Sequence, residues 1–496
     1  MLLAVRSRLA DSPGGSREAA GGLPVGGGEI PTAHFMKIAT HNSLMMLPLL
    51  AVSALGQRMA VTTFASLDGT DGAGLPAAIV QGRDGNLYGT AGGGGRYGHG
   101  TVFKLTAGGA LTPLVSFALT NGEEPYGGLV QAPDGSLYGT TFQGGQYGRG
   151  TVFKLAPDGA LTTLVNFSAT NGGSLFGRVA QGTNGNLYGT TAEGGTGPYA
   201  GTVFELAPEG ELTTLVTFHG TNGDSPWAGL TLGSDGNFYG TTAQGGDLTL
   251  HSGSGVGTVF RLKQSGAFTS LAAFEETNGA FPEGELVEGR DGSFYGTTVS
   301  GGAFGHGTLF KVTTAGILTA LVSFDMTNGG APYAGLLLGT DGNFYGTASQ
   351  GGNLSLVNGR GAGTLFRMSP DGRLTTLVIF GDAFTNGGWS FASLLEASDG
   401  NLYGTTGGGK FNKGSIFRVS GLNLVPKFQS IQISGGLVHL AWGAIPGRSY
   451  RVQYRTDLGS TNWTDLPGDV VANSSTAVKT DAVAARHRFY RVLLLP

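Results

Sequence analysis

A nine-residue segment recurs seven times along the chain. Its last copy, residues 398–406, reads SDGNLYGTT, and the earlier copies read RDGNLYGTA, PDGSLYGTT, TNGNLYGTT, SDGNFYGTT, RDGSFYGTT and TDGNFYGTA. The tyrosines of successive copies are 50, 50, 51, 56, 50 and 58 residues apart. A repeat of this length, built from short extended segments, is typical of a β-propeller or a related array. The segment is therefore predicted to be structural, because a catalytic role would require seven copies of one site.

Each repeat divides into four short segments rich in Val, Leu, Phe, Tyr and Thr. In the second repeat these are residues 128–131, 137–141, 150–155 and 161–167. They show no 3.6-residue periodicity, so we predict strands. Asp-Gly pairs fall between the first and second segments and between the third and fourth, where they supply the positive φ of tight hairpins. Each repeat is thus predicted to be one antiparallel propeller blade, and the glycine after the tyrosine is predicted to allow close packing between blades.

The two ends of the repeat region complement each other. Residues 61–66, VTTFAS, match the fourth segment of a repeat, whereas the seventh repeat ends at Ser420 without one. We therefore expect the N-terminal strand to complete the last blade, which would leave no open sheet edge. The predicted fold is all-β: a seven-bladed β-propeller over residues 57–420, closed by the N-terminal strand and followed by a small β-sandwich.

The chain before the repeats resembles an export signal. A lysine follows Met36, and an apolar run covers residues 44–55. This pattern predicts a signal peptide over 36–56, too short to span a bilayer as a helix. Residues 1–35 are then a leader upstream of the true start, or a disordered segment. The alternative is a cytoplasmic leader followed by a buried apolar segment. We expect a secreted or cell-surface protein without a membrane span in its mature chain.

The chain after the repeats has a different pattern. Residues 421–429 are predicted to be a linker, and residues 430–496 hold about six short alternating segments. Five aromatic residues are available for a core there, which indicates a small β-sandwich: Trp442, Tyr450, Tyr454, Trp463 and Tyr490.

Composition excludes several classes of function. The chain has no cysteine, so disulfides, thiolate metal sites and a cysteine nucleophile are ruled out. Charged residues make up 12% of the chain and the formal net charge is −4, which provides no basic surface for nucleic acid. The histidine positions do not form a ligand set either, since His99 and His306 are replaced by Arg149 and Ala200 in equivalent loops.

The motifs TNG, PYGGLV, DGNLYGTT, GG, GTVFKL and PDG together resemble the Gloeo-Verruco tandem repeat of choice-of-anchor proteins. The resemblance covers about residues 61–420. It implies an exported bacterial repeat protein and no enzymatic activity. The Gly-Gly after the second segment is similar to kelch repeats, although the kelch tryptophan is absent. Residues 446–458, PGRSYRVQYRTDL, with NWTDL and FYRV, look like a fibronectin type III-like module, which implies a spacer or adhesion role. The C-terminal RVLLLP differs from the membrane anchor that the family name implies.

A ligand is expected on the face that carries the TNG loops and the GG loops, because variable loops on a rigid scaffold usually carry binding. The position after the TNG loop holds, in successive repeats, Pro76, Tyr126, Phe176, Trp227, Glu283, Tyr333 and Phe391. Such aromatics could stack on sugars or hydrophobic ligands. The alternative is that they pack between neighbouring blades. The candidate ligand-binding residues are Tyr126, Trp227, Tyr333, Phe391, Glu283 and Glu285.

Five glutamates gather in one repeat, at positions 275, 276, 283, 285 and 288. Oxygen-rich clusters suit Ca²⁺, so Glu283 and Glu285 are a candidate site for this ion, and paired carboxylates suit glycoside hydrolysis. The alternative is a solvated acidic face. Two functions therefore remain open. One is a non-enzymatic recognition or scaffold protein that binds extracellular polysaccharide or a surface protein. The other is a carbohydrate-active propeller enzyme, a glycoside hydrolase or lyase.

Overall fold

The computed structural model describes residues 3–6, 59–195, 200–381, 388–422, 428–434, 437–444, 449–456, 463–473, 476–482 and 487–495. Their regular structure is β-strand, with two single-turn 3-10 helices at His251–Gly253 and Val357–Gly359. The chain forms two units, one over Gln57–Asn423 and one that includes Leu424–Pro496. The predicted signal peptide, 36–56, lies outside the described residues. Within these residues, no helix has the length and apolar character needed to cross a membrane.

The first unit contains seven antiparallel sheets of the same construction, here called repeat sheets 1 to 7. In six of them four consecutive strands lie side by side in chain order. Sheet 1 has β4 (Val80–Gln81), β5 (Leu87–Gly93), β6 (Thr101–Leu105) and β7 (Leu111–Ser116), with β3 (Ala73–Pro76) also beside β5. Sheet 2 has β8 (Val130–Gln131), β9 (Leu137–Thr141), β10 (Thr151–Leu155) and β11 (Leu161–Asn166). Sheet 3 has β12 (Ala180–Gln181), β13 (Leu187–Thr191), β14 (Thr202–Leu206) and β15 (Leu212–Thr217).

Sheets 4 to 6 repeat this order. Sheet 4 has β16 (Thr231–Leu232), β17 (Phe238–Thr242), β18 (Thr258–Leu262) and β19 (Phe268–Ala273). Sheet 5 has β20 (Val287–Glu288), β21 (Phe294–Thr298), β22 (Thr308–Val312) and β23 (Leu318–Ser323). Sheet 6 has β24 (Leu337–Leu338), β25 (Phe344–Ala348), β26 (Thr364–Met368) and β27 (Leu374–Ile379).

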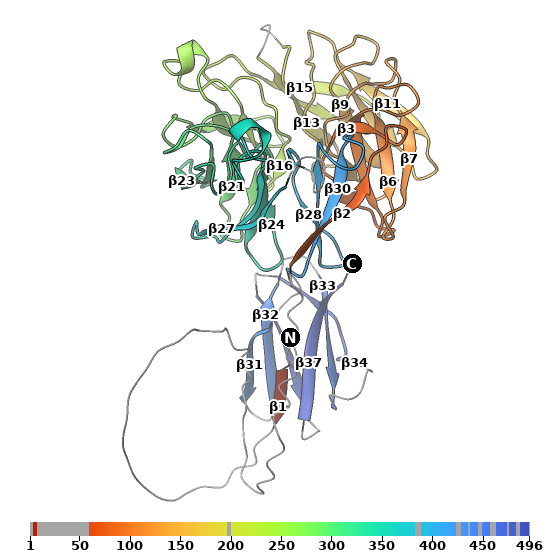
Figure 1. Cartoon of the computed structure of the whole chain (residues 1–496), viewed down its shortest axis with the longest axis vertical. Coiled ribbons are helices and arrows are strands. Elements are labelled where there is room, and N and C mark those ends of the chain that lie inside the picture. Colours follow the sequence, from red (N-terminus) through yellow and green to blue (C-terminus); the bar gives the residue numbers. More distant parts are fainter. Residues whose placement is uncertain are drawn as a thin grey trace, which may run out of the picture. The chain divides into compact units, whose positions relative to one another are not determined.

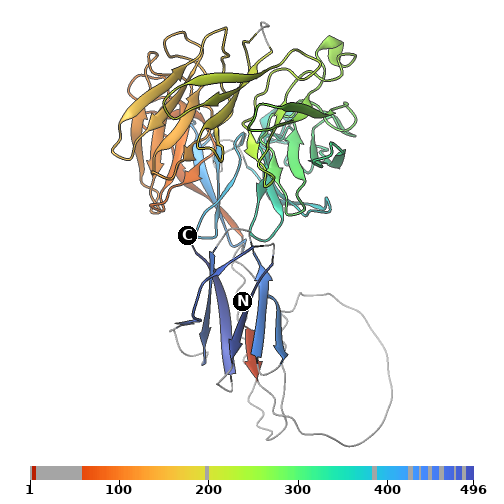
Figure 2. The same ribbon diagram turned by 180° about the vertical axis from the view of Figure 1, so that it is seen from behind.

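Sheet 7 is assembled from both ends of the repeat region. Its strands are β28 (Leu395–Glu396), β29 (Leu402–Thr406), β30 (Ser415–Ser420) and the N-terminal β2 (Ala60–Ser66). The register runs from Ala60 opposite Ser420 to Ser66 opposite Ser415, so β2 takes the place predicted for it. Figure 1 shows β2 beside β30, and Figure 2 shows the same succession of sheets from behind.

Sheets 7 and 1 also share a hydrophobic core. Leu67, which follows β2, is buried with residues of sheet 1 and with Tyr403 and Ile416 of sheet 7. The first and last repeats are therefore joined both by backbone hydrogen bonds and by side-chain packing.

The repeated nine-residue segment builds a hydrogen-bonded hairpin turn. In sheet 1, Asp84 accepts hydrogen bonds from the backbone N–H of Asn86 (3.1 Å), the Tyr88 hydroxyl (2.8 Å) and Lys104 Nζ (3.1 Å). Burial raises the pKa of Asp84, but these donors outweigh it and hold the pKa well below its usual value. The same tyrosine-to-aspartate bond recurs at Tyr239, Tyr295, Tyr345 and Tyr403. The aspartates and tyrosines of these turns are thus structural.

The glycine after each tyrosine accommodates a phenylalanine of the same sheet. Gly139 lies directly opposite Phe153, and a Cβ added to it would lie 2.5 Å from that ring. The prediction that this glycine allows close packing between blades is therefore wrong. The close contact is between two strands of the same sheet. The link between sheets is made by the next residue, where Thr140 Oγ1 donates to the carbonyl of Gly177 in the following repeat at 3.0 Å. Thr90, Thr190 and Thr297 make equivalent bonds.

The C-terminal unit contains two antiparallel sheets over one core. One sheet has β31 (Phe428–Ser434), β32 (Leu437–Gly443) and β36 (Thr476–Ala482). The other has β33 (Ser449–Arg455), β34 (Thr464–Asp465), β35 (Val470–Val471) and β37 (His487–Leu494). β1 (Leu3–Arg6) pairs with β37, although the sequence predicts no strand before residue 36.

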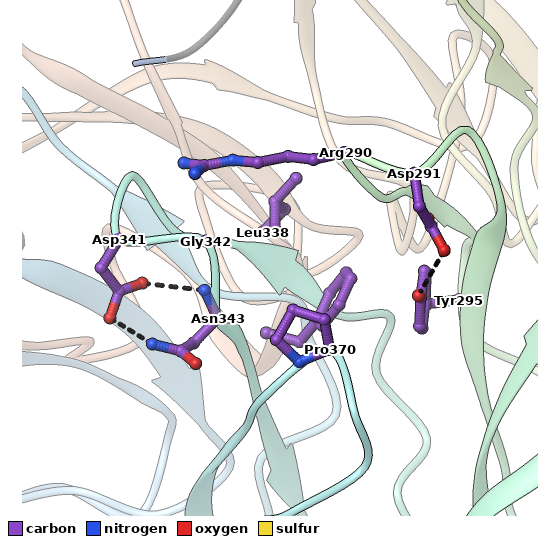
Figure 3. A pocket seen from close by; sticks show the side chains of 9 residues that line it. Arg290, Asp291, Tyr295, Leu338, Asp341, Gly342, Asn343 and Pro370 are labelled. Carbon is purple, nitrogen blue, oxygen red and sulfur yellow. Dashed lines mark hydrogen bonds between the residues drawn. The ribbon is translucent and has the colours of Figure 1, made fainter. Parts of the chain in front are cut away.

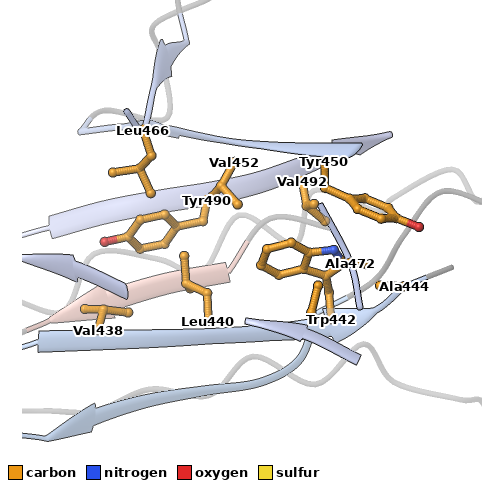
Figure 4. Close-up of a cluster of buried hydrophobic side chains, with 11 residues drawn as sticks. Val438, Leu440, Trp442, Ala444, Tyr450, Val452, Leu466, Ala472, Tyr490 and Val492 are labelled. Atoms are coloured by element: carbon orange, nitrogen blue, oxygen red, sulfur yellow. The ribbon is translucent and has the colours of Figure 1, made fainter. Parts of the chain in front are cut away.

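Residues from both sheets of this unit form a single buried cluster, as Figure 4 shows. Leu440 and Trp442 lie on β32, and Val452 and Tyr490 lie on β33 and β37. Buried Asp481 accepts hydrogen bonds from the Tyr490 hydroxyl (2.6 Å) and from Arg488 (2.5 Å), which compensates its charge.

Candidate binding site on the loop face

In repeat sheets 2 to 6 the TNG loop and the GG loop lie together at one end of the sheet. Backbone bridges join them, for example between Asp224 and Gln244 and between Ala280 and Ser300. The asparagine of the TNG motif is part of the loop's own structure: Asn121 Oδ1 accepts the backbone N–H of Ala118 at 2.9 Å. We call this end of the sheets the loop face. The asparagine of the TNG motif therefore shapes the loop itself.

One residue per repeat, the loop-face row, comes after the TNG loop: Pro76, Tyr126, Phe176, Trp227, Glu283, Tyr333 and Phe391. In six repeats the residue two positions earlier has a left-handed backbone, with φ between 49° and 58°, although none is glycine. These residues are Glu124, Ser174, Ser225, Phe281, Ala331 and Trp389. Such a conformation costs on the order of 1 kcal/mol and persists only where the surroundings enforce it.

Two backbone hydrogen bonds enforce it in each case. The N–H of Phe281 donates to the carbonyl of Val256 in the preceding repeat at 2.9 Å, and its carbonyl accepts from Val299 of its own repeat at 3.1 Å. Ser225 is held in the same way by Ala200 and Ala243. The backbone two residues before each of these six row positions is therefore fixed by hydrogen bonds to two neighbouring sheets. No motif in the sequence marks these left-handed positions, because their residue types differ from repeat to repeat.

The aromatic members of the row contact one another across sheet boundaries. Ring centroids are 6.2 Å apart for Tyr126 and Phe176 and 5.0 Å apart for Phe176 and Trp227, both in stacked geometry. Tyr333 and Phe391 form a second pair at 4.9 Å. These side chains thus pack between neighbouring repeat sheets. Trp227 and Phe391 nevertheless keep 36% and 38% of their surface exposed, so they remain available to a ligand.

Glu283 interrupts the row between Trp227 and Tyr333. No described residue donates a hydrogen bond to its carboxylate or forms an ion pair with it. Burial raises the pKa of Glu283 to about 7. Burial also raises the pKa of Tyr333, and the charge of Glu283 raises it further.

A second set of positions lies two residues further along the chain, and we call it the inner row: Ala78, Gly128, Arg178, Gly229, Glu285, Gly335 and Ser393. Its two charged members form an ion pair, with Arg178 Nε 2.7 Å from Glu285 Oε2. The negative charge of Glu285 raises the pKa of Arg178. The structure therefore separates Glu285, which is paired, from its neighbour Glu283, which is not.

The remaining glutamates of this repeat do not join them. Glu288 accepts hydrogen bonds from the N–H and hydroxyl of Ser234, and so links sheets 5 and 4. Glu275 and Glu276 are exposed in the TNG loop. Among the described residues, no group of three or more His, Asp or Glu side chains is placed to hold a metal ion.

A pocket of about 440 Å³ lies at the opposite end of sheets 5 and 6, among the hairpin turns. Figure 3 shows Arg290, Asp291 and Asp341 around it. Its carboxylates are already engaged: Asp291 binds Tyr295 and Lys311, and Asp341 binds Asn343 and Tyr345. This pocket contains none of the predicted site residues, and its polar groups belong to the turn network of the repeats.

Seven sheets of equal construction, linked by recurring threonine-to-carbonyl hydrogen bonds, define an all-β tandem-repeat protein. The chain belongs to the family described as the Gloeobacter/Verrucomicrobia repeat, whose model matches residues 53–251 and 248–436. No curated protein matches the sequence.

Three solved structures illustrate the structural similarity. A puromycin hydrolase has 14% sequence identity and a TM-score of 0.44, over 76% of this chain and 60% of that chain. A Mycobacterium tuberculosis puromycin-hydrolyzing peptidase has 13% identity and a TM-score of 0.43, over 76% and 59%. An ulvan lyase has 10% identity and a TM-score of 0.33, over 62% and 79%. The chain thus spans less than two thirds of the two puromycin-cleaving proteins.

Proposed function

We propose that the chain is an exported, non-enzymatic recognition or scaffold protein of a bacterial cell surface that binds a glycan or another surface polymer on its loop face. In this proposal the seven repeat sheets form a closed seven-bladed propeller, and the C-terminal unit is a fibronectin type III-like β-sandwich that acts as a spacer. Residues 36–56 direct export.

Contacts between the first and last repeats support a closed ring. Besides the pairing of β2 with β30, the backbone N–H of Ser398 donates to Gln81 Oε1 at 2.8 Å, and Gln81 Nε2 donates to Ser398 Oγ at 3.0 Å. These bonds join sheet 7 to sheet 1. A ring closed in this way gives the loop-face row a fixed spacing, which a polymer-binding surface needs.

The exposed aromatic surface at Trp227 is the observation that carries the binding proposal. Its ring is stacked on Phe176 and still 36% exposed, and the backbone that precedes it is clamped between sheets 3 and 4. A rigid aromatic side chain supplies a large contact area at a low entropic cost. Sugar rings and other flat apolar faces are the ligands that such a platform accepts.

A carbohydrate-active enzyme is the second candidate, favoured by the raised pKa of Glu283, because a general acid must hold its proton near neutral pH. Glycosidases usually need a second carboxylate, and the nearest one in sequence, Glu285, is bound to Arg178. If catalysis occurs, glycan incubated with the protein will release new reducing or unsaturated ends, and Glu283→Gln will abolish their release.

The test of binding is a glycan-array screen with the full chain, followed by affinity and thermal-melt measurements on Trp227→Ala and Tyr333→Ala. Loss of stacking should weaken binding by about fivefold or more, as expected for an aromatic contact of ~1 kcal/mol. Ile317→Ala is the control, because Ile317 is an exposed apolar residue in the hairpin turn between β22 and β23, at the end of sheet 5 opposite the loop face. If Trp227→Ala and Tyr333→Ala instead cost about 3–5 kcal/mol of stability without changing affinity, the row serves packing only.

A further inference from the structure

We propose that the segment of the loop-face row formed by Trp227, Glu283 and Tyr333 selects a sugar that carries an unsubstituted, protonated amine. This inference rests on the proposed function, because it names the class of glycan bound at the same surface.

The spacing of the row places Glu283 between two aromatic side chains. Neighbouring members of the row contact each other at centroid distances of 5.0 Å for Phe176 and Trp227 and 4.9 Å for Tyr333 and Phe391. Glu283 occupies the one position between these two groups. The backbone segments that carry Glu283 and Tyr333 also lie close together, because a Cβ on Gly284 would lie 2.7 Å from the backbone nitrogen of Gly335. Trp227 and Tyr333 thus have their aromatic partners on the sides away from Glu283.

The carboxylate of Glu283 has no cation of its own among the described residues. Arg178, the one basic residue of the inner row, is bound to Glu285 at 2.7 Å. His251, on the insertion loop of sheet 4, packs its ring edge-on against Phe281 at 4.9 Å. A partly buried carboxylate without a compensating partner is unfavourable, and a ligand that supplies a positive charge would relieve this.

The chemistry of the three side chains fits an ammonium group. The Glu283 carboxylate can accept hydrogen bonds from the N–H groups of the ammonium. The faces of Trp227 and Tyr333 can attract the positive charge of the same group. An N-acetylated amine carries no charge and leaves the carboxylate uncompensated. A uronate or sulfate sugar would bring a second negative charge to the site and be repelled. The site therefore discriminates among sugars of similar shape by the charge on their nitrogen.

The experiment compares three oligosaccharides of equal length by titration calorimetry with the full chain: β-1,4-linked glucosamine, N-acetylglucosamine and glucose. The titrations are run at several pH values on both sides of 7, because the proposed contact needs both a protonated amine and an ionised Glu283, whose pKa is about 7. We expect the amine oligomer to bind at least ~10-fold more tightly than the other two, as a desolvated cation–carboxylate contact implies. Glu283→Gln should abolish this preference, and Glu276→Gln, which changes an exposed glutamate of the preceding loop, should retain it.

The possible failures are distinguishable. Equal or tighter binding of the N-acetylated or neutral oligomer overturns the amine preference and leaves glycan binding intact. A preference that survives in Glu283→Gln reflects general attraction to an acidic protein and also overturns the inference. Absence of binding to all three oligomers, together with a negative glycan array, overturns the proposed function itself.

Discussion

Arg178 and Glu285 form an ion pair that passes over Gly229, with 2.7 Å between Arg178 Nε and Glu285 Oε2. The two residues belong to sheets 3 and 5, and Gly229 belongs to the sheet between them. A Cβ on Gly229 would lie 2.5 Å from Glu285 Oε1 and 2.6 Å from the carbonyl oxygen of Arg178. The ion pair between Arg178 and Glu285 therefore requires a residue without a side chain at Gly229, the inner-row position between them.

Gly229→Ala should consequently destabilise the protein, although alanine is the smallest possible addition. The Cβ would displace the Glu285 carboxylate and press on backbone, and overpacking of this kind costs about 1–3 kcal/mol. Gly128→Ala is the matched control, because the same position of sheet 2 would bring a Cβ no closer than 3.3 Å to the carbonyl of Ala78. Chemical denaturation measures both variants. Equal stability of the two would show that the ion pair does not depend on Gly229.

In sheet 3 the carboxylate of the turn network lies on the neighbouring strand. Where other repeats have aspartate and a basic residue, this one has Asn184 and Glu205. Glu205 accepts the Tyr188 hydroxyl at 2.6 Å and the side-chain amides of Asn186 and Asn184 at 2.7 and 3.1 Å. Burial, followed by the hydrogen bond to Glu205, raises the pKa of Tyr188 to about 12. The acceptor has moved to the neighbouring strand, and the tyrosine remains satisfied.

This exchange predicts a strong coupling between the two positions. Glu205→Lys alone removes the acceptor of Tyr188, and Asn184→Asp alone places a carboxylate against Glu205, so each should cost about 1 kcal/mol. The double variant restores the arrangement of the other repeats and should recover most of that loss, with a coupling energy of about 1 kcal/mol or more. A double-mutant cycle from urea melts measures it. Strictly additive effects would contradict the proposed equivalence of the two networks.

Much of the repeat architecture was predictable because its signals are local. The predicted segments 137–141 and 161–167 correspond to β9 (Leu137–Thr141) and β11 (Leu161–Asn166), because Asp-Gly turns fix where each strand ends. The first segment was predicted as 128–131, but the strand β8 is only Val130–Gln131. The residues before β8 belong to the loop-face row and the inner row, which contact neighbouring sheets. No local sequence pattern indicates these contacts.

The candidate site was predictable only as a set of positions. Equivalent residues after each TNG loop could be aligned from the repeat, and this identified Trp227, Glu283 and Tyr333. The pairing of Glu285 with Arg178 could not be anticipated, because it joins residues 107 positions apart through the absence of a side chain at Gly229. The left-handed residues before the row were also missed, since non-glycine residues adopt this conformation only under tertiary constraint.

The N-terminal strand provides a direct test of how the first and last repeats are joined. A chain that begins at residue 68 lacks β2 and loses the pairing with β30 and the buried contact of Leu67. We expect a loss of more than about 3 kcal/mol of stability, as for removal of buried apolar groups. Amide hydrogen exchange should accelerate in Ser415–Ser420, while a chain that begins at Gln57 retains protection there. Unchanged protection in the shorter chain would mean that β2 is dispensable for sheet 7.

Ala331 tests whether the left-handed backbone before the row is a conformational constraint. Its φ is 49°, which glycine adopts freely and a β-branched residue does not. Ala331→Gly should leave stability within about 1 kcal/mol of the parent, because relief of strain offsets the added flexibility of the unfolded chain. Ala331→Val should cost about 2 kcal/mol or more. Thermal melts compare the two, and equal melting temperatures would refute the constraint.

Glu283 should make stability depend on pH in a direction opposite to that of most carboxylates. Its pKa is raised by burial from 4.5 to about 7 in the folded protein, so the folded state holds a proton that the unfolded state has released in this interval. The stabilising contribution is complete below pH 4.5 and is lost as pH rises through 7. Since one pKa unit corresponds to ~1.4 kcal/mol, the free energy of unfolding should fall by about 2–3 kcal/mol across this window.

Glu283→Gln isolates this contribution, because glutamine keeps the shape of the side chain and does not titrate. The difference in unfolding free energy between parent and variant should change with pH between 4.5 and 7 and stay constant on either side. Other ionisable groups near the row cancel in this difference: Glu285 and Arg178 remain paired, and His251 and Tyr333 are present in both proteins. Denaturant melts of both proteins over a series of pH values measure this difference in unfolding free energy. A difference that does not vary with pH would mean that Glu283 is solvated and ionised like an ordinary surface carboxylate, and that it has no uncompensated buried charge for a cationic ligand to neutralise.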